Sequence, residues 1–162
     1  MRKYNAYIKL VKSMLKDLGY SFVKVKASKV MAADMEKQVI LLDTEWFDKN
    51  NEQAKTSYKA VKKLYKTYGW KVDVGMGTFA ILHELGHCLT APTYENLDKE
   101  INAYNHKQDK LTARKLDPYN EMKEYRKIRL ERDADLTAYA IYRKNRKLIK
   151  AYDKKLNELL AG

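Results

Sequence analysis

The sequence predicts an α+β fold that is mostly helical, with a small sheet beside one motif-bearing helix. Apolar residues recur at helical spacing in several long segments, whereas short alternating runs occur only between residues 21 and 42. The chain has 162 residues, which is the size of one domain, and it contains no internal repeat and no low-complexity linker. We therefore expect a single domain over residues 1–162, with residues 146–162 as a helical C-terminal extension.

The first quarter of the chain predicts one helix followed by three short strands. Residues 3–18 carry apolar side chains at three- and four-residue spacing with lysines between them, and Gly19 is placed to end that helix. Alternation and β-branched residues then predict strands at Ser21–Lys26, Val30–Met35 and Gln38–Leu42.

The rest of the chain predicts helices that are separated by glycine and proline. Residues 51–68 form an apolar stripe rich in tyrosine, which Gly69 ends. A glycine-rich lead-in is followed by a helix from Thr78, a candidate N-cap, to about Thr90. The remaining expected elements are a weakly patterned helix over 94–113 and one long helix from Pro118 to about Leu160, with a break near Asn145.

Composition excludes a membrane-spanning chain and favours a reducing compartment. No apolar run approaches the roughly 18 residues that cross a bilayer, and lysines interrupt every stretch that could form a signal-peptide core. Cys88 is the only cysteine, so no intrachain disulfide can form. The expected location is the cytoplasm, without a membrane partner.

The formal net charge of +12 has two interpretations. It is either an electrostatic surface for nucleic acid or another anionic partner, or the solvated faces of lysine-rich helices. The cations are mostly lysine and are scattered over every segment, without a known RNA-reading motif. We expect at most weak, salt-dependent and non-specific nucleic-acid binding.

The segment that most clearly indicates a catalytic metal site is the pentapeptide His83-Glu84-Leu85-Gly86-His87. On a helix its two histidines lie one turn apart on one face, where they can occupy two corners of a tetrahedral zinc site. Glu84 is rotated by about 100° from His83, so its carboxylate can act as general base on water that zinc acidifies. The motif predicts one Zn²⁺ per chain, with His83 and His87 as metal ligands and Glu84 as the catalytic residue.

A catalytic zinc usually has three protein ligands, so one must come from outside the motif. The position six residues after the second histidine, where an extended motif has its third, is Thr93. The best candidate is Glu131, which lies one helical turn before Asp135 on a face that also carries Ala134 and Ala138. Small alanines would let this helix approach the motif helix closely. We expect Glu131 to bind the metal and Asp135 to accept the outer N–H of a ligand histidine.

Other side chains near these motifs have weaker claims. His106 is the rival third ligand, although it stands in a polar segment typical of a solvated histidine. Cys88 is expected to be a packed thiol and Asp133 a solvated carboxylate. One of the 13 tyrosines could stabilise an oxyanion. Tyr139, one helical turn after Asp135, is a candidate by its position in the sequence, although nothing distinguishes it from a packed residue.

These segments resemble the zincin metallopeptidases, and within them the ImmA/IrrE family. The resemblance rests on three segments, which are Phe79–His87, the pattern Glu131-x-x-Ala134-Asp135-x-x-Ala138, and the strand Val39–Asp43. It implies a compact zincin-like fold with two histidines and Glu131 as zinc ligands. It also implies that Val39–Leu42 lies beside the cleft, where an extended substrate could pair with it as an added strand.

The expected function is that of a zinc-dependent endopeptidase, which hydrolyses a peptide bond with metal-activated water. The resemblance implies a protein substrate such as a transcriptional regulator or another DNA-binding protein, in the setting of a phage or mobile element. One alternative is a catalytically weak zincin that binds a protein or nucleic acid through its basic surface. Another is a zinc hydrolase that acts on a small amide. The oligomeric state stays open.

Overall fold

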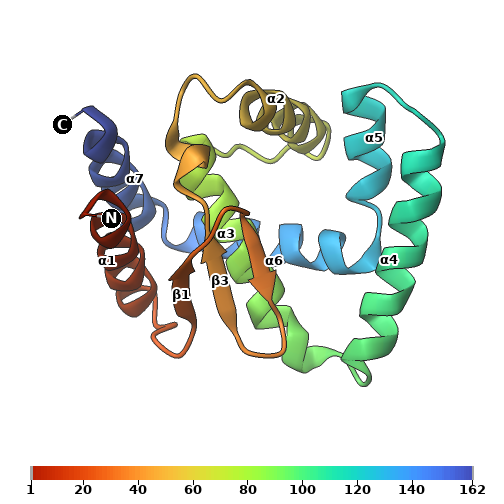
Figure 1. The fold of residues 1–162 in the computed structure, drawn as a ribbon, viewed down its shortest axis with the longest axis horizontal. Helices are drawn as coiled ribbons and strands as arrows, with labels where there is room; N and C mark the ends of the chain where they lie inside the picture. The colour runs from red at the N-terminus through yellow and green to blue at the C-terminus, as the bar shows by residue number, and fades with distance from the viewer. Residues whose placement is uncertain (1, 162) are drawn as a thin grey trace.

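The structure is a computed structural model that describes residues 2–161, and it has the α+β fold that the sequence predicts (Figure 1). The described residues form seven α-helices, two short 3-10 helices and one small sheet. The α-helices are α1 (Arg2–Asp17), α2 (Glu52–Thr67), α3 (Met76–Thr90), α4 (Leu97–Ala113), α5 (Pro118–Tyr125), α6 (Arg129–Lys144) and α7 (Arg146–Ala161). The strands are β1 (Lys24–Ala27), β2 (Ala32–Asp34) and β3 (Val39–Leu42), and the 3-10 helices are η1 (Thr44–Phe47) and η2 (Ala91–Thr93).

The sheet has the strand order β1-β3-β2, with β3 parallel to β1 and antiparallel to β2. The alternation predicted for the first strand holds, since Val23 and Val25 are buried while Lys24 is exposed, but the strand begins at Lys24 rather than Ser21. Because β3 is central, both of its edges are occupied, and it cannot accept the added strand that the family resemblance implied. The edge strand on the side of the motif helix is β2 instead.

The motif helix α3 is the most buried helix of the fold and packs against the sheet, η1 and α6. It begins at Met76, with Gly75 rather than Thr78 at the N-cap position. The Thr78 hydroxyl donates to Asp153 Oδ1 of α7 over 2.6 Å, and the backbone N–H of Gly75 donates to the same oxygen over 3.0 Å. A carboxylate from the far end of the chain therefore caps the first turn of α3.

The long helix predicted from Pro118 onward is three helices, because the chain breaks at two places. The expected break at Asn145 is present, where the backbone leaves helical geometry and the side chain donates to the carbonyl of Ile141. A second break lies at residues 126–128, where Ile128 has an extended backbone. The last helix, α7, packs beside α1 at the opposite end of the sequence (Figure 1). None of the helices described is long and apolar enough to cross a bilayer.

Candidate metal centre

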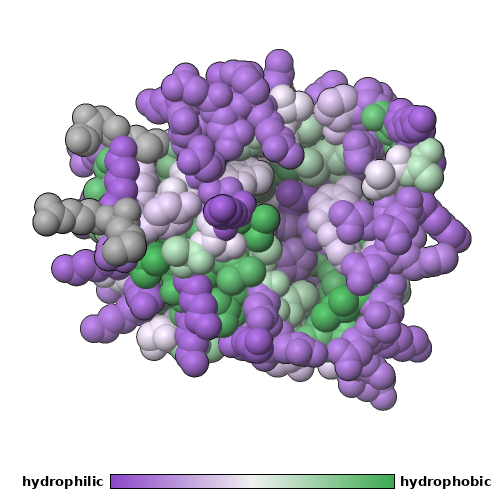
Figure 2. Space-filling view, in the orientation of Figure 1, coloured by the Kyte–Doolittle hydropathy of each residue, from purple (hydrophilic) through white to green (hydrophobic). Residues whose placement is uncertain are grey.

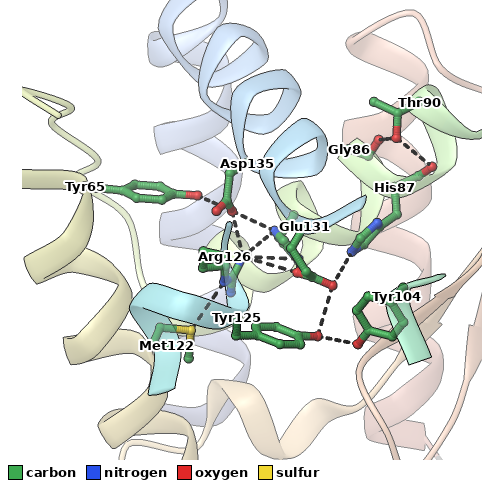
Figure 3. Close-up of polar contacts among 11 residues, drawn as sticks. Tyr65, Gly86, His87, Thr90, Tyr104, Met122, Tyr125, Arg126, Glu131 and Asp135 are labelled. Carbon is green, nitrogen blue, oxygen red and sulfur yellow. Dashed lines mark hydrogen bonds and ion pairs between the residues drawn. The ribbon is translucent and has the colours of Figure 1, made fainter. Parts of the chain in front are cut away.

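Two helices supply the donor atoms of the site, α3 with the histidines and α6 with the carboxylates (Figure 3). The two helices are in close contact at Gly86, inside the motif. A Cβ atom built on Gly86 would lie 2.3 Å from the backbone oxygen of Ala134. A residue without a side chain is therefore required at this position. The small side chains on this face of α6 let the two helices approach closely, as the sequence predicted. This approach brings Glu131 against the histidines.

His83, His87 and Glu131 converge at one point between these helices. The Nε2 atom of His83 lies 2.8 Å from Glu131 Oε2, and the Nε2 atom of His87 lies 3.1 Å from Glu131 Oε1. All three side chains are buried, with at most 7% of each residue exposed. One donor atom from each lies within 4.8 Å of the others, so the group is geometrically able to hold a metal ion.

The chemistry of this donor set calls for a cation. A neutral imidazole protonated at Nδ1 presents a lone pair at Nε2, so two imidazole lone pairs and a carboxylate face one another. The guanidinium of Arg126, with Nη1 3.2 Å from His83 Nε2 and 3.7 Å from Glu131 Oε2, offsets part of the repulsion. A proton or a metal ion between the three donors would relieve the rest. Burial and Arg126 lower the pKa of His83, but the carboxylates of Glu131 and Asp135 outweigh them and raise it to about 9. Burial also opposes ionisation of Glu131, yet the facing histidines hold the pKa of its carboxyl well below its usual range.

Asp135 supports the site from behind His83, as expected from its place one turn after Glu131. Its Oδ1 atom lies 2.9 Å from His83 Nδ1, and it also accepts hydrogen bonds from the Tyr65 hydroxyl and from Arg126 Nη1. This network fixes the orientation of one imidazole. The Nδ1 atom of His87 is buried without a hydrogen-bond partner among the described residues, so the two histidines of the group are not supported equally.

The catalytic candidate Glu84 lines a cavity of about 600 Å³ together with His83, His87 and Glu131. Burial raises the pKa of the Glu84 carboxyl above its usual value. Figure 2 shows that the molecule is hollowed on the face that carries the sheet, with both polar and apolar walls. The apolar part of the lining consists mainly of Met31, Trp46, Ile101, Met122 and Leu130.

Other sequence-predicted residues lie away from the donor group or differ from expectation. His106 is exposed on α4 and is not part of the metal-ligating group found among the described residues. Tyr139 stacks on Trp70, with ring centroids 4.6 Å apart, and does not line the cavity. Cys88 is a packed thiol as predicted, whereas Asp133 is half-buried and accepts a hydrogen bond from Tyr94.

Three residues of the site were missed by sequence reasoning, namely Tyr104, Tyr125 and Arg126. The Tyr125 hydroxyl lies 3.0 Å from Glu131 Oε1 and 2.6 Å from the Tyr104 hydroxyl (Figure 3). The guanidinium of Arg126 forms an ion pair with Asp135, with the closest atoms 2.6 Å apart. The chain break at 126–128 lets Tyr125 and Arg126 face the candidate metal-binding group, and the continuous helix predicted for this segment does not anticipate that placement.

No protein-family model, no curated protein and no solved structure matches this chain. The resemblance to the ImmA/IrrE family therefore stays a prediction, and the function must be inferred from the geometry of the site.

Proposed function

We propose that this protein is a zinc-dependent endopeptidase. The observation that carries the proposal is the convergence of His83, His87 and Glu131, with Glu84 beside them in one cavity. Two imidazoles and one carboxylate are a known donor set of catalytic zinc, and they leave a fourth position open. Imidazole donors also favour zinc over magnesium or calcium, which prefer oxygen.

In the proposed reaction, side chains of the protein move one proton and stabilise the negative charge that develops on the carbonyl oxygen. A zinc ion held there would supply Lewis acidity, which polarises a carbonyl and acidifies water. Glu84 follows His83 on α3 and lines the same cavity, so its carboxylate can take the proton from the attacking water and pass it to the departing amine. Burial and then Glu131 raise the pKa of Tyr125, so its hydroxyl remains a donor and can serve the carbonyl oxygen as that oxygen becomes negative.

The shape of the cavity favours a polypeptide over a small amide as the substrate. The hollow is open on the face seen in Figure 2, whereas a small-amide hydrolase is expected to enclose its substrate. The edge strand β2 contributes Ala32, Ala33 and Asp34 to the wall, and an extended peptide can add to such an edge. The family resemblance points further, to a transcriptional regulator as the protein that is cut.

The test is to measure metal content and hydrolysis together in three purified proteins: wild type, Glu84→Gln, and the double variant His83→Ala, His87→Ala. The probes are zinc analysis and a library of internally quenched peptides. We expect about one zinc per chain in wild type and in Glu84→Gln, and none in the double variant. Glu84→Gln should cut about 10²–10⁴ times more slowly, because an amide cannot accept the proton.

Glu95→Gln is the matched control, because Glu95 is exposed and does not line the cavity. It should behave as wild type in both measurements. Equal zinc content in wild type and in the double histidine variant would refute the metal site. Full zinc occupancy without cleavage of any peptide in the library would instead favour the alternative, a zincin that binds a partner without cutting it.

A further inference from the structure

A second surface lies around Trp70, where the end of α2, the loop after it and one face of α6 meet. Two hollows of about 430 Å³ each adjoin there, and Trp70 lines both of them. The first is walled by α2 and the loop, and the second by α6. We call this region the Trp70 surface. It is separate from the metal-lined cavity, with which it shares no lining residue.

The aromatic residues of the Trp70 surface are placed by the turn that ends α2. Gly69 adopts a left-handed backbone with φ of 71°, and the N–H of Trp70 then donates to the carbonyl of Tyr65 over 2.9 Å. This turn folds Trp70 back onto Tyr139, against which it stacks with an interplanar angle of 8°. Tyr68 meets Trp70 edge-on with ring centroids 5.1 Å apart, and 50% of its area is exposed. The result is a packed aromatic group in which Tyr68 is the most exposed ring, while Trp70 and Tyr139 are half-buried.

The same surface is strongly basic and carries no acidic residue in its walls. Lys62, Lys66 and Lys71 line the first hollow, and Arg143 and Lys144 line the second. All five cations are exposed, and none of them takes part in an ion pair within the part of the chain described. Such a concentration of unpaired cations attracts a polyanion.

We propose that the Trp70 surface binds single-stranded nucleic acid, with a base stacked on Tyr68 and backbone phosphates on the five cations. Single-strand sites combine a positive groove with aromatic rings, because every base has a face that can stack. A duplex hides those faces, and an acidic peptide would use the cations but has no need of the ring. The proposal gives five of the 33 basic residues a specific role and does not depend on peptidase activity.

Variants for the test must leave the metal centre intact, which determines the choice of residues. Tyr65 packs against Trp70 and also donates its hydroxyl to Asp135, the residue behind His83. Changes at Tyr65 or Trp70 would therefore disturb both sites. Tyr68 and the exposed lysines do not touch the metal-ligating group, so they are the residues to change.

The experiment measures binding of a fluorescein-labelled oligothymidylate of about 16 nucleotides by anisotropy over a series of salt concentrations. The proteins are wild type, Tyr68→Ala, Tyr68→Phe, and the double variant Lys66→Gln, Lys71→Gln. We expect Tyr68→Ala to raise Kd about tenfold without changing the salt dependence, because stacking is abolished. Tyr68→Phe should bind as wild type. The double lysine variant should reduce the slope of log K against log salt by about 0.7 for each phosphate that the protein no longer neutralises.

Matched controls come from elsewhere on the surface. Phe22→Ala removes another exposed aromatic ring, and the double variant Lys9→Gln, Lys12→Gln removes the same charge from α1. Both should bind the oligonucleotide as wild type does. Equal weakening in the controls and in the Tyr68 and Lys66/Lys71 variants would overturn the assignment of the site. Binding to a duplex as tight as to the single strand would overturn stacking, and equal competition by polyglutamate would assign the surface to an acidic protein.

Discussion

The packing of α3 against α6 predicts an unusual outcome for Gly86→Ala. In an ordinary helix this change stabilises the protein by about 0.5–1 kcal/mol. Here the added Cβ would lie 2.3 Å from the backbone oxygen of Ala134 and 3.0 Å from its carbonyl carbon. Backbone atoms cannot turn away, so the two helices must separate by about 1 Å to restore van der Waals contact. Overpacking of this kind costs about 1–3 kcal/mol, which outweighs the gain in helix propensity.

The same separation acts on the metal centre, because the histidines are on α3 and Glu131 is on α6. Distances from donor to metal tolerate changes of only about 0.2 Å. We therefore expect Gly86→Ala to lower the melting temperature of the metal-free protein by about 2–8 °C and to weaken zinc binding by more than about tenfold. The measurements are thermal unfolding in chelator and a zinc titration against a competing chromophoric chelator.

Gly77→Ala is the matched control in the same helix. Its Cβ would lie 2.4 Å from the ring of Phe47, a similarly short contact with a buried side chain that does not involve α6. Gly77→Ala should therefore lose stability but keep the zinc affinity of wild type. If Gly86→Ala proved neutral or stabilising, or if both variants lost zinc equally, the idea that Gly86 sets the distance between ligands would be wrong.

Three further predictions concern the site and its support. Tyr125→Phe should keep zinc yet cut peptides about 10²–10³ times more slowly, and an unchanged rate would exclude its hydroxyl from the reaction. In zinc titrations Glu131→Ala should lose the metal, Asp135→Ala should bind about 10–100 times more weakly, and His106→Ala should match wild type; the reverse order would make His106 the ligand. Asp153→Ala should lower the free energy of unfolding by about 1 kcal/mol in urea, because it uncaps α3, and Asp153→Asn, which keeps an acceptor, should lose less.

Local patterns predicted the parts of the structure that neighbouring residues control. Helical spacing located α1 and α2, and the spacing of His83 and His87 predicted the face of α3 that is geometrically able to hold a metal ion. The break before α6 was missed, because the apolar pattern continues through Ile128 and no glycine or proline marks the bend. Because the break was missed, the position of Arg126 beside Asp135 was missed as well.

The tertiary arrangement of these elements could not be predicted from the sequence, for a different reason. The central position of β3 depends on pairing with two strands at once, and a run of four apolar residues is equally typical of a central strand and of one beside a cleft. The capping of α3 by Asp153 joins positions far apart in the sequence, and nothing near Asp153 indicates its partner. For Glu131, by contrast, the small residues beside it gave the signal.

The pairing of α1 with α7 has a consequence for how the chain folds during synthesis. Tyr7, Val11 and Met14 of α1 are completely buried, as are Ile149 and Leu156 of α7, and the two helices lie side by side. The part of the inner face of α1 that α7 covers therefore stays exposed until synthesis has passed α7, although β1 and Phe47 can cover other parts of that face earlier. Contacts so distant in sequence form slowly, because a long loop must close first. Until then the nascent chain exposes an apolar face of α1 to which a chaperone can bind, and Asp153 is not yet available to cap α3.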